Sequence, residues 1–115
     1  MAIAEYKTGS GVTISTTEYS LVTPGTTLAT DATDGVYQVF INPTAMAAGD
    51  EYLFQVKEKV ATTSSQATVY SLTLEGAQSY PLAFPSLILM HGWDVTVKKI
   101  AGTDRAFDWS IRKVA

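Results

Sequence analysis

The sequence predicts an all-β chain that folds as a two-sheet antiparallel sandwich, jelly-roll-like, with about eight strands. Short segments alternate apolar and polar residues, which is the period of a half-buried strand. Residues that favour strands, chiefly Thr, Val, Ile, Tyr, Phe and Trp, dominate over helix formers. Clusters of turn residues interrupt the chain roughly every 8 to 12 residues, as in sandwiches and barrels. An immunoglobulin-like sandwich is the alternative, although the chain has no Cys for that fold's signature.

The N-terminal residues 1–11 are polar and end in a Gly-Ser-Gly sequence, so we expect them to form a flexible arm. The remaining residues, 12–115, have the size of a single β-sandwich domain. Its first strands are expected at Val12–Ser15 and Tyr19–Thr23. A turn-rich connection follows from Pro24 to Gly35.

The segment Val36–Asn42 has large apolar residues on both faces, which predicts a central strand. Pro43 should end this strand, because proline cannot donate a hydrogen bond to a sheet. The segment Thr44–Ala48 is the only helix-like stretch. It is short and is followed by Gly49, so we expect one helical turn at most.

The next two strands are predicted at Glu51–Val60 and Val69–Glu75, where the alternation is clean. The polar stretch Ala61–Gln66 joins them as an exposed linker, so we expect a hairpin. A long loop, Gly76–Pro85, then leads to a short apolar strand at Leu87–Met90.

The last quarter of the chain contains two alternating segments and both Trp residues. A Gly/Thr/Asp turn separates the segments, which predicts a second hairpin. We expect one face of each segment to lie in the core, and we expect truncation of either Trp to cost about 3–5 kcal/mol. The core-facing residues are Trp93, Val95, Val97, Phe107, Trp109 and Ile111.

Composition argues against several classes of partner. The net charge is −3, and no run of Lys or Arg exceeds a pair, whereas nucleic-acid binding requires a basic stripe. No signal peptide is recognisable at the N-terminus. The most apolar run, Pro81–Met90, is too short to span a membrane. We therefore expect no nucleic acid and no membrane as partner, and synthesis in the cytoplasm.

No arrangement of residues predicts an enzyme. The chain has no Cys, and its only histidine, His91, lies beside no recognisable catalytic partner. A carboxylate pair such as Asp104 and Asp108 could in principle serve a glycosidase. These two residues are more simply interpreted as a turn residue and an outward strand residue. We expect no catalytic residues and no cofactor.

Two acidic segments offer oxygen atoms that could bind calcium, which takes its ligands from flexible loops. They are Asp31–Gly35 and Asp50-Glu51. Their spacing departs from that of an EF-hand, so an ordinary turn is the simpler interpretation and no metal site is expected.

Most of the six Tyr and two Trp residues alternate with polar residues and are expected in the core. The exception is the loop Tyr80–Pro85, whose apolar residues indicate a protein partner rather than a small ligand.

Two parts of the chain, Gly35–Val60 and Val95–Arg112, resemble small virion proteins of tailed bacteriophages. The similar features are the turn Ala47–Asp50, the strand end Lys57–Val60 and the segment Ala101–Trp109. Together these parts cover about half of the chain.

The resemblance implies a capsid decoration, or cement, protein that binds the outer surface of a phage head and clamps neighbouring subunits of the major capsid protein. It also implies a homo-trimer located in the virion, since several weak contacts made together strengthen binding. A tail or neck protein and a carbohydrate-binding adsorption module are the alternatives. The expected partner-binding residues come from the arm and the apolar loop: Ile3, Tyr6, Tyr80, Leu82, Phe84 and Pro85.

Overall fold

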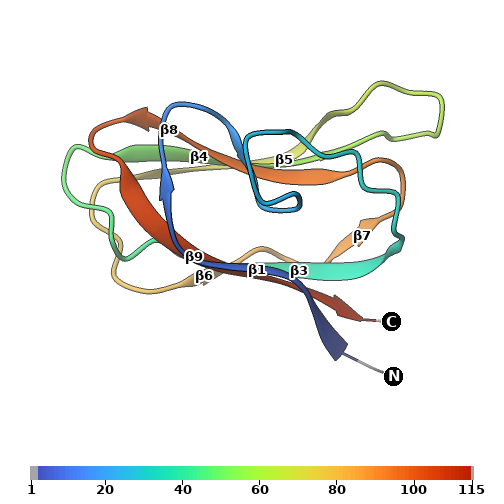
Figure 1. Ribbon diagram of the computed structural model, residues 1–115, viewed down its shortest axis with the longest axis horizontal. Coiled ribbons are helices and arrows are strands. Elements are labelled where there is room, and N and C mark those ends of the chain that lie inside the picture. The colour runs from blue at the N-terminus through green and yellow to red at the C-terminus, as the bar shows by residue number, and fades with distance from the viewer. Residues whose placement is uncertain (1–2, 115) are drawn as a thin grey trace.

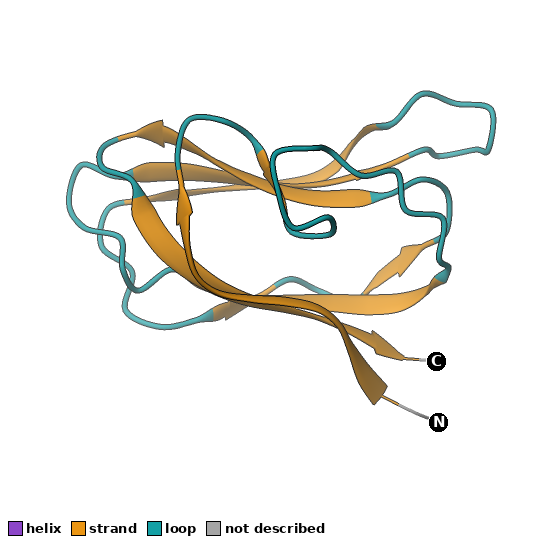
Figure 2. Ribbon diagram, viewed as in Figure 1, coloured by secondary structure: helices purple, strands orange, loops and turns teal. Residues whose placement is uncertain are grey.

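The computed structural model describes residues 3 to 114, which form nine strands in two antiparallel sheets packed face to face (Figure 1). Only strands and loops occur in this part of the chain (Figure 2). Sheet A contains, in spatial order, β1 (Ile3–Ile14), β9 (Arg105–Val114), β3 (Gly35–Asn42) and β6 (Leu82–Ala83), with β7 (Leu87–Leu89) also on β3. Sheet B contains β2 (Tyr19–Ser20), β8 (Asp94–Ala101), β4 (Glu51–Glu58) and β5 (Ala67–Glu75). The predicted all-β sandwich is confirmed.

The strands pair as nested neighbours, which is the arrangement of a jelly roll. β1 pairs with β9, β2 with β8, β3 with both β6 and β7, and β4 with β5. β6 and β7 follow the same edge of β3, and between them the Phe84 amide donates to the Val39 carbonyl at 2.8 Å. They are one strand interrupted near Pro85, which explains nine observed strands where about eight are predicted.

Of the two predicted hairpins, one is confirmed and one is wrong. β4 and β5 pair antiparallel from Glu51 opposite Glu75 to Glu58 opposite Ala67. β8 and β9, in contrast, belong to different sheets, and the chain crosses from one sheet to the other between Ala101 and Arg105.

The error at β8 and β9 has a physical cause. Trp93, Val95 and Val97 line sheet B's side of the core, and Phe107 and Trp109 line the opposite side. These residues are all at most 4% exposed, as the alternation predicts. An alternating pattern identifies the buried face of a strand, but it does not say whether the next strand lies beside it or across the core.

The N-terminal segment forms a strand rather than the expected flexible arm. Residues 3 to 11 are part of β1, which pairs with β9 from Ile3 opposite Val114 to Ile14 opposite Arg105, with two register shifts. Backbone hydrogen bonds hold this edge strand, so its side chains can remain largely polar. Met1 and Ala2 of the expected arm lie outside the described residues.

The segment Val36–Asn42 is a central strand, as predicted, with β9 on one side and β6 and β7 on the other. Its inward side chains are fully buried, whereas Phe40 on the outer face is half-buried and Val36 is exposed. Thr44–Ala48 forms turns without a helix. Within residues 3 to 114, no helix is long and apolar enough to cross a membrane.

Asp50 ties the turn before β4 to the crossover between β8 and β9. Its carboxylate accepts hydrogen bonds from the backbone amides of Thr103 and Ala47, both at 2.9 Å, and from Arg105 Nε at 2.7 Å. The two amides, followed by the Arg105 guanidinium, lower the pKa of Asp50 from 3.8 to about 2. A lowered pKa means that the folded state favours the charged carboxylate.

We therefore expect Asp50 to stabilise the fold fully above pH 3.8, and this contribution to be lost as the pH falls through about 2. Asp50→Asn should lower the free energy of unfolding at neutral pH, with a smaller loss at pH 2, in urea denaturation. Burial raises the pKa of Asp94, so the pH dependence of its contribution to stability is opposite to that of Asp50. Asp94 is present in both proteins, so the difference between wild type and variant isolates the contribution of Asp50. Asp104→Asn is the control. It removes an ion pair between Lys99 and Asp104, and the Asp104 side chain is 45% exposed, so the free energy of unfolding should change little. An equal loss at both pH values would contradict this role of Asp50.

Candidate partner-binding face

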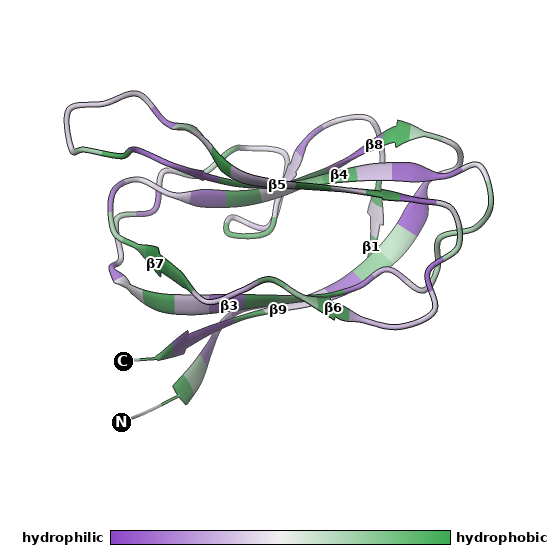
Figure 3. Ribbon diagram, turned by 180° about the vertical axis from the view of Figure 1, so that it is seen from behind, coloured by the Kyte–Doolittle hydropathy of each residue, from purple (hydrophilic) through white to green (hydrophobic). Residues whose placement is uncertain are grey.

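The outer face of sheet A carries four neighbouring aliphatic side chains at the end where both chain termini lie (Figure 1). Val36 lies opposite both Ile88 and Val114, and Val114 lies opposite Ile3. Directly opposite residues in a sheet point to the same face, so they form one row, which we call the aliphatic row. Ile3 is 72% exposed, Ile88 76% and Val36 37%, and Val114 is half-buried. β7, which supplies Ile88, is coloured hydrophobic in Figure 3.

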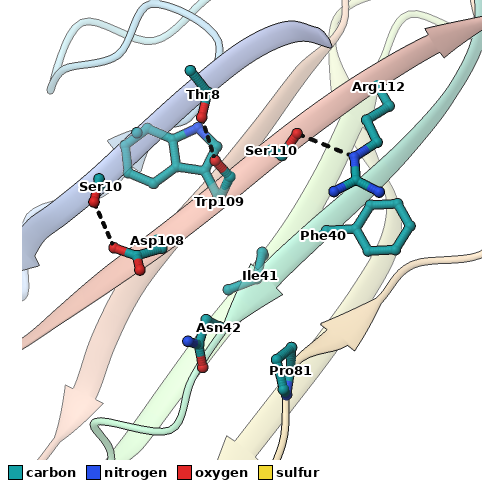
Figure 4. A pocket seen from close by; sticks show the side chains of 11 residues that line it. Thr8, Ser10, Phe40, Ile41, Asn42, Pro81, Asp108, Trp109, Ser110 and Arg112 are labelled. Carbon is teal, nitrogen blue, oxygen red and sulfur yellow. Dashed lines mark hydrogen bonds between the residues drawn. The ribbon is translucent and has the colours of Figure 1, made fainter. Parts of the chain in front are cut away.

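Arg112 and Phe40 lie next to the aliphatic row. The Arg112 guanidinium stacks on the Phe40 ring, 3.9 Å from its centroid, which is a favourable cation–π contact. Arg112 Nε donates to Ser110 Oγ at 3.3 Å (Figure 4). Ser110 Oγ in turn donates to Glu5 Oε2 at 2.6 Å. Among residues 3 to 114, the two terminal guanidinium nitrogens make no hydrogen bond, so they are available to an acceptor on a partner.

Phe40 and Arg112 separate two shallow hollows on this face, with volumes of about 400 and 220 Å³. The larger hollow lies towards Asn42, Pro81 and Asp108 and has a polar rim (Figure 4). The smaller hollow is lined by members of the aliphatic row. We call the aliphatic row together with Phe40 and Arg112 the docking face.

The partner-binding residues predicted from the sequence are divided between the surface and the interior. Ile3 belongs to the docking face, and Tyr80 and Pro85 are exposed on the segment that borders it. Leu82 is half-buried in β6. These four residues are available for contact, at least in part.

The other two predicted residues point inward. Phe84 is 1% exposed and packs edge-on against Tyr70, so it stabilises the fold and does not reach a partner. Tyr6 is half-buried and lies against Tyr37 and Trp93, with ring centroids 5.4 and 6.0 Å away.

Three members of the aliphatic row were not predicted as partner-binding residues: Val36, Ile88 and Val114. They are far apart in the sequence and become neighbours only through the register of β7, β3 and β9. The one sequence signal was that Val36–Asn42 has apolar residues on both faces.

The residues considered for catalysis have separate structural partners. Asp104 Oδ1 accepts from Lys99 Nζ at 2.6 Å, whereas Asp108 Oδ1 accepts from Ser10 Oγ at 3.2 Å. The backbone amide of His91 donates to Glu58 Oε2, and within the described residues its imidazole makes no hydrogen bond. The structure therefore does not assemble these side chains into one site.

The acidic segments considered for calcium are also engaged elsewhere. Asp31 accepts hydrogen bonds from the Tyr6 hydroxyl at 2.7 Å and from the Thr33 amide at 2.8 Å. Asp50 binds Thr103, Ala47 and Arg105, as described above. In residues 3 to 114, no three His, Cys, Asp or Glu side chains are grouped so that they could hold a metal ion.

No family model and no curated protein matches this chain. Among solved structures, it is similar to a protein of the disulfide-linked pili that Bacillus endospore appendages form, with a TM-score of 0.52 and 15% identity over 98% of this chain and 88% of that one. It is also similar to the Yersinia pseudotuberculosis-derived mitogen, with a TM-score of 0.51 and 14% identity over 99% and 86% of the two chains. A xylan-binding domain of CBM22 aligns with a TM-score of 0.43 and 18% identity over 73% of this chain and 57% of that domain. At these identities, the first two similarities concern the β-sandwich fold alone.

Proposed function

We propose that this chain is a structural virion protein that binds the outer surface of a phage capsid and clamps neighbouring subunits of the major capsid protein. The aliphatic row is the observation that supports binding to a protein surface. Full burial of one aliphatic side chain contributes about 1.5–3 kcal/mol. Association costs about 4–15 kcal/mol, so several such side chains on one face are needed to offset it.

The side chains of the docking face also indicate which chemical groups a complementary partner surface would present. Apolar side chains of a capsid subunit would cover the aliphatic row, and a carboxylate would accept hydrogen bonds from the free end of Arg112. Stacking on Phe40 fixes the guanidinium before binding, which reduces the entropy lost in the complex.

The phage assignment is supported by the resemblance of Gly35–Val60 and Val95–Arg112 to virion proteins. The similar pilus protein comes from an assembled appendage, so a sandwich of this shape is compatible with a role in an assembly. A tail or neck protein is the alternative within the same class. Copy number per virion separates the two, because covering a head requires many more copies than one ring.

The proposal predicts that Ile88→Asp weakens binding to undecorated phage heads by at least about tenfold, because the new carboxylate would be desolvated against an apolar surface. Co-sedimentation of the purified protein with the heads measures this effect. Val60→Asp is the matched control, since Val60 is 78% exposed and lies on the loop after β4, away from the docking face. Equal binding by Ile88→Asp and wild type, or no binding by wild type, would contradict the proposal.

The carbohydrate-binding alternative requires exposed aromatic side chains on one face. Trp93 and Trp109 are 0% and 4% exposed, and Tyr80 is the one strongly exposed aromatic residue among those described. We therefore expect polysaccharides to leave the Trp fluorescence unchanged. A saturable change in that fluorescence would favour the carbohydrate-binding module.

A further inference from the structure

β5 is an open edge of sheet B. Within residues 3 to 114, β4 is its single strand neighbour, so the other side of its backbone has no partner strand. The regular part of β5, Tyr70–Leu74, contains no charged residue, Pro or Gly, which are the usual protections of an edge strand. The other long edge strand, β1, is interrupted by two register shifts and contains Gly11 with a φ of 63°. β5 is therefore the edge that is suited to accept another strand.

The same edge leaves apolar side chains partly uncovered. Tyr70, Leu72 and Leu74 point inward from β5 and are half-buried. A groove of about 340 Å³ is lined by Leu72 and Leu74, and also by Leu82 and Tyr80. A strand added at β5 would bury part of this apolar surface as well as satisfy the backbone groups.

We propose that a second copy of this chain occupies the edge, with the two β5 strands antiparallel and paired about Leu72. In this register Leu72 lies opposite the partner's Leu72, and Tyr70 lies opposite the partner's Leu74. On the outer face, Ser71 lies opposite the partner's Thr73. The segment is thus complementary to itself, with apolar residues meeting on the inner face and small hydroxyl residues on the outer face.

Charge also favours self-pairing in this register. The nearest charged residue of β5, Glu75, lies opposite the partner's Val69, so the two copies of Glu75 do not face each other. Val69 is the residue at which β5 shifts register against β4, which limits regular pairing to the stretch Tyr70–Leu74.

The two-fold axis of this dimer stands perpendicular to sheet B, so sheet A of both copies lies on the same side. The two docking faces would then point in one direction. If the proposed function holds, the dimer binds a repeating capsid surface at two points and gains affinity from the higher effective concentration. The pairing predicts a dimer in place of the trimer that the resemblance implies.

The test is the mass of the full chain by sedimentation equilibrium over a series of concentrations. The chain has a mass of 12.3 kDa, and we expect wild type to reach twice this value. The double variant Ser71→Lys/Thr73→Lys places like charges opposite each other across the axis, and it should raise the dimer dissociation constant by at least about tenfold. Both residues are exposed in the monomer, so the fold should persist, which circular dichroism checks.

The matched control is Ser71→Lys/Thr73→Glu, which places opposite charges across the axis and should retain the dimer. A wild-type monomer at every concentration, or an oligomer that Ser71→Lys/Thr73→Lys leaves intact, would overturn the proposal. Loss of the dimer in both double variants would overturn the register about Leu72. Ile88→Asp should remain dimeric, so failure of capsid binding by an intact dimer would count against the proposed function and not against the pairing.

Discussion

Replacement of Trp93 by Ala is expected to lower the free energy of unfolding by about 3–5 kcal/mol. Trp93 is fully buried, and its ring centroid lies 4.5 Å from that of Tyr37 and 6.0 Å from that of Tyr6. Its indole nitrogen donates to the Thr33 carbonyl at 3.0 Å. Truncation removes these contacts and leaves a cavity between tightly packed aromatic rings. Urea denaturation of both proteins measures the difference.

Trp93→Phe is the control, because it retains an aromatic ring in the same space and loses the hydrogen bond to Thr33. We expect it to cost clearly less than Trp93→Ala. A cost below about 1 kcal/mol for Trp93→Ala would mean that Trp93 is not a core residue, since this is the size of an average substitution.

Replacement of Gly9 by Ala is expected to cost about 1–3 kcal/mol. Gly9 lies opposite Trp109 in the register of β1 and β9, and a Cβ atom there would overlap the Trp109 indole. The indole is 4% exposed, and Tyr19 packs against it edge-on at 5.7 Å, so it has little freedom to move away. We expect a lower urea midpoint and faster amide exchange along β1.

Gly25→Ala is the matched control for this variant. The nearest atom to a Cβ at Gly25 is 4.0 Å away, so the change should be close to neutral. If Gly9→Ala were equally neutral, β1 would not be paired with β9 with Gly9 against the Trp109 indole. Residues 3 to 11 would then behave as the flexible arm that their composition predicts.

The sequence predicted the apolar faces of the long strands that lie inside the sandwich, because alternation marks the buried face of each strand. It did not predict that Asp94 and Thr96, which alternate with the core residues of β8, are also buried. It predicted the burial of Trp93 and Trp109 and the pairing of β4 with β5, which a short linker joins. It did not predict that β8 and β9 lie in opposite sheets. Both arrangements bury the same residues, so the pattern could not distinguish them.

The docking face was harder to predict, because it depends on contacts between distant segments. Ile3, Val36, Ile88 and Val114 form one row only when β1, β9, β3 and β7 are in register. Phe84 is an error in the other direction, because the sequence predicted that it contacts a partner. In the structure it is buried, and its backbone amide donates a hydrogen bond to β3. Local sequence does not predict the register in which distant strands pair, and it does not predict the direction of a side chain in a loop.

An image reconstruction of the phage particle that carries this protein tests the central claim most directly. The account predicts density for many copies on the outside of the head, each with the outer face of sheet A against the capsid and Ile88 and Val36 covered. Density for the protein in the tail or neck alone, or a head-bound copy whose sheet A faces solvent, would contradict it.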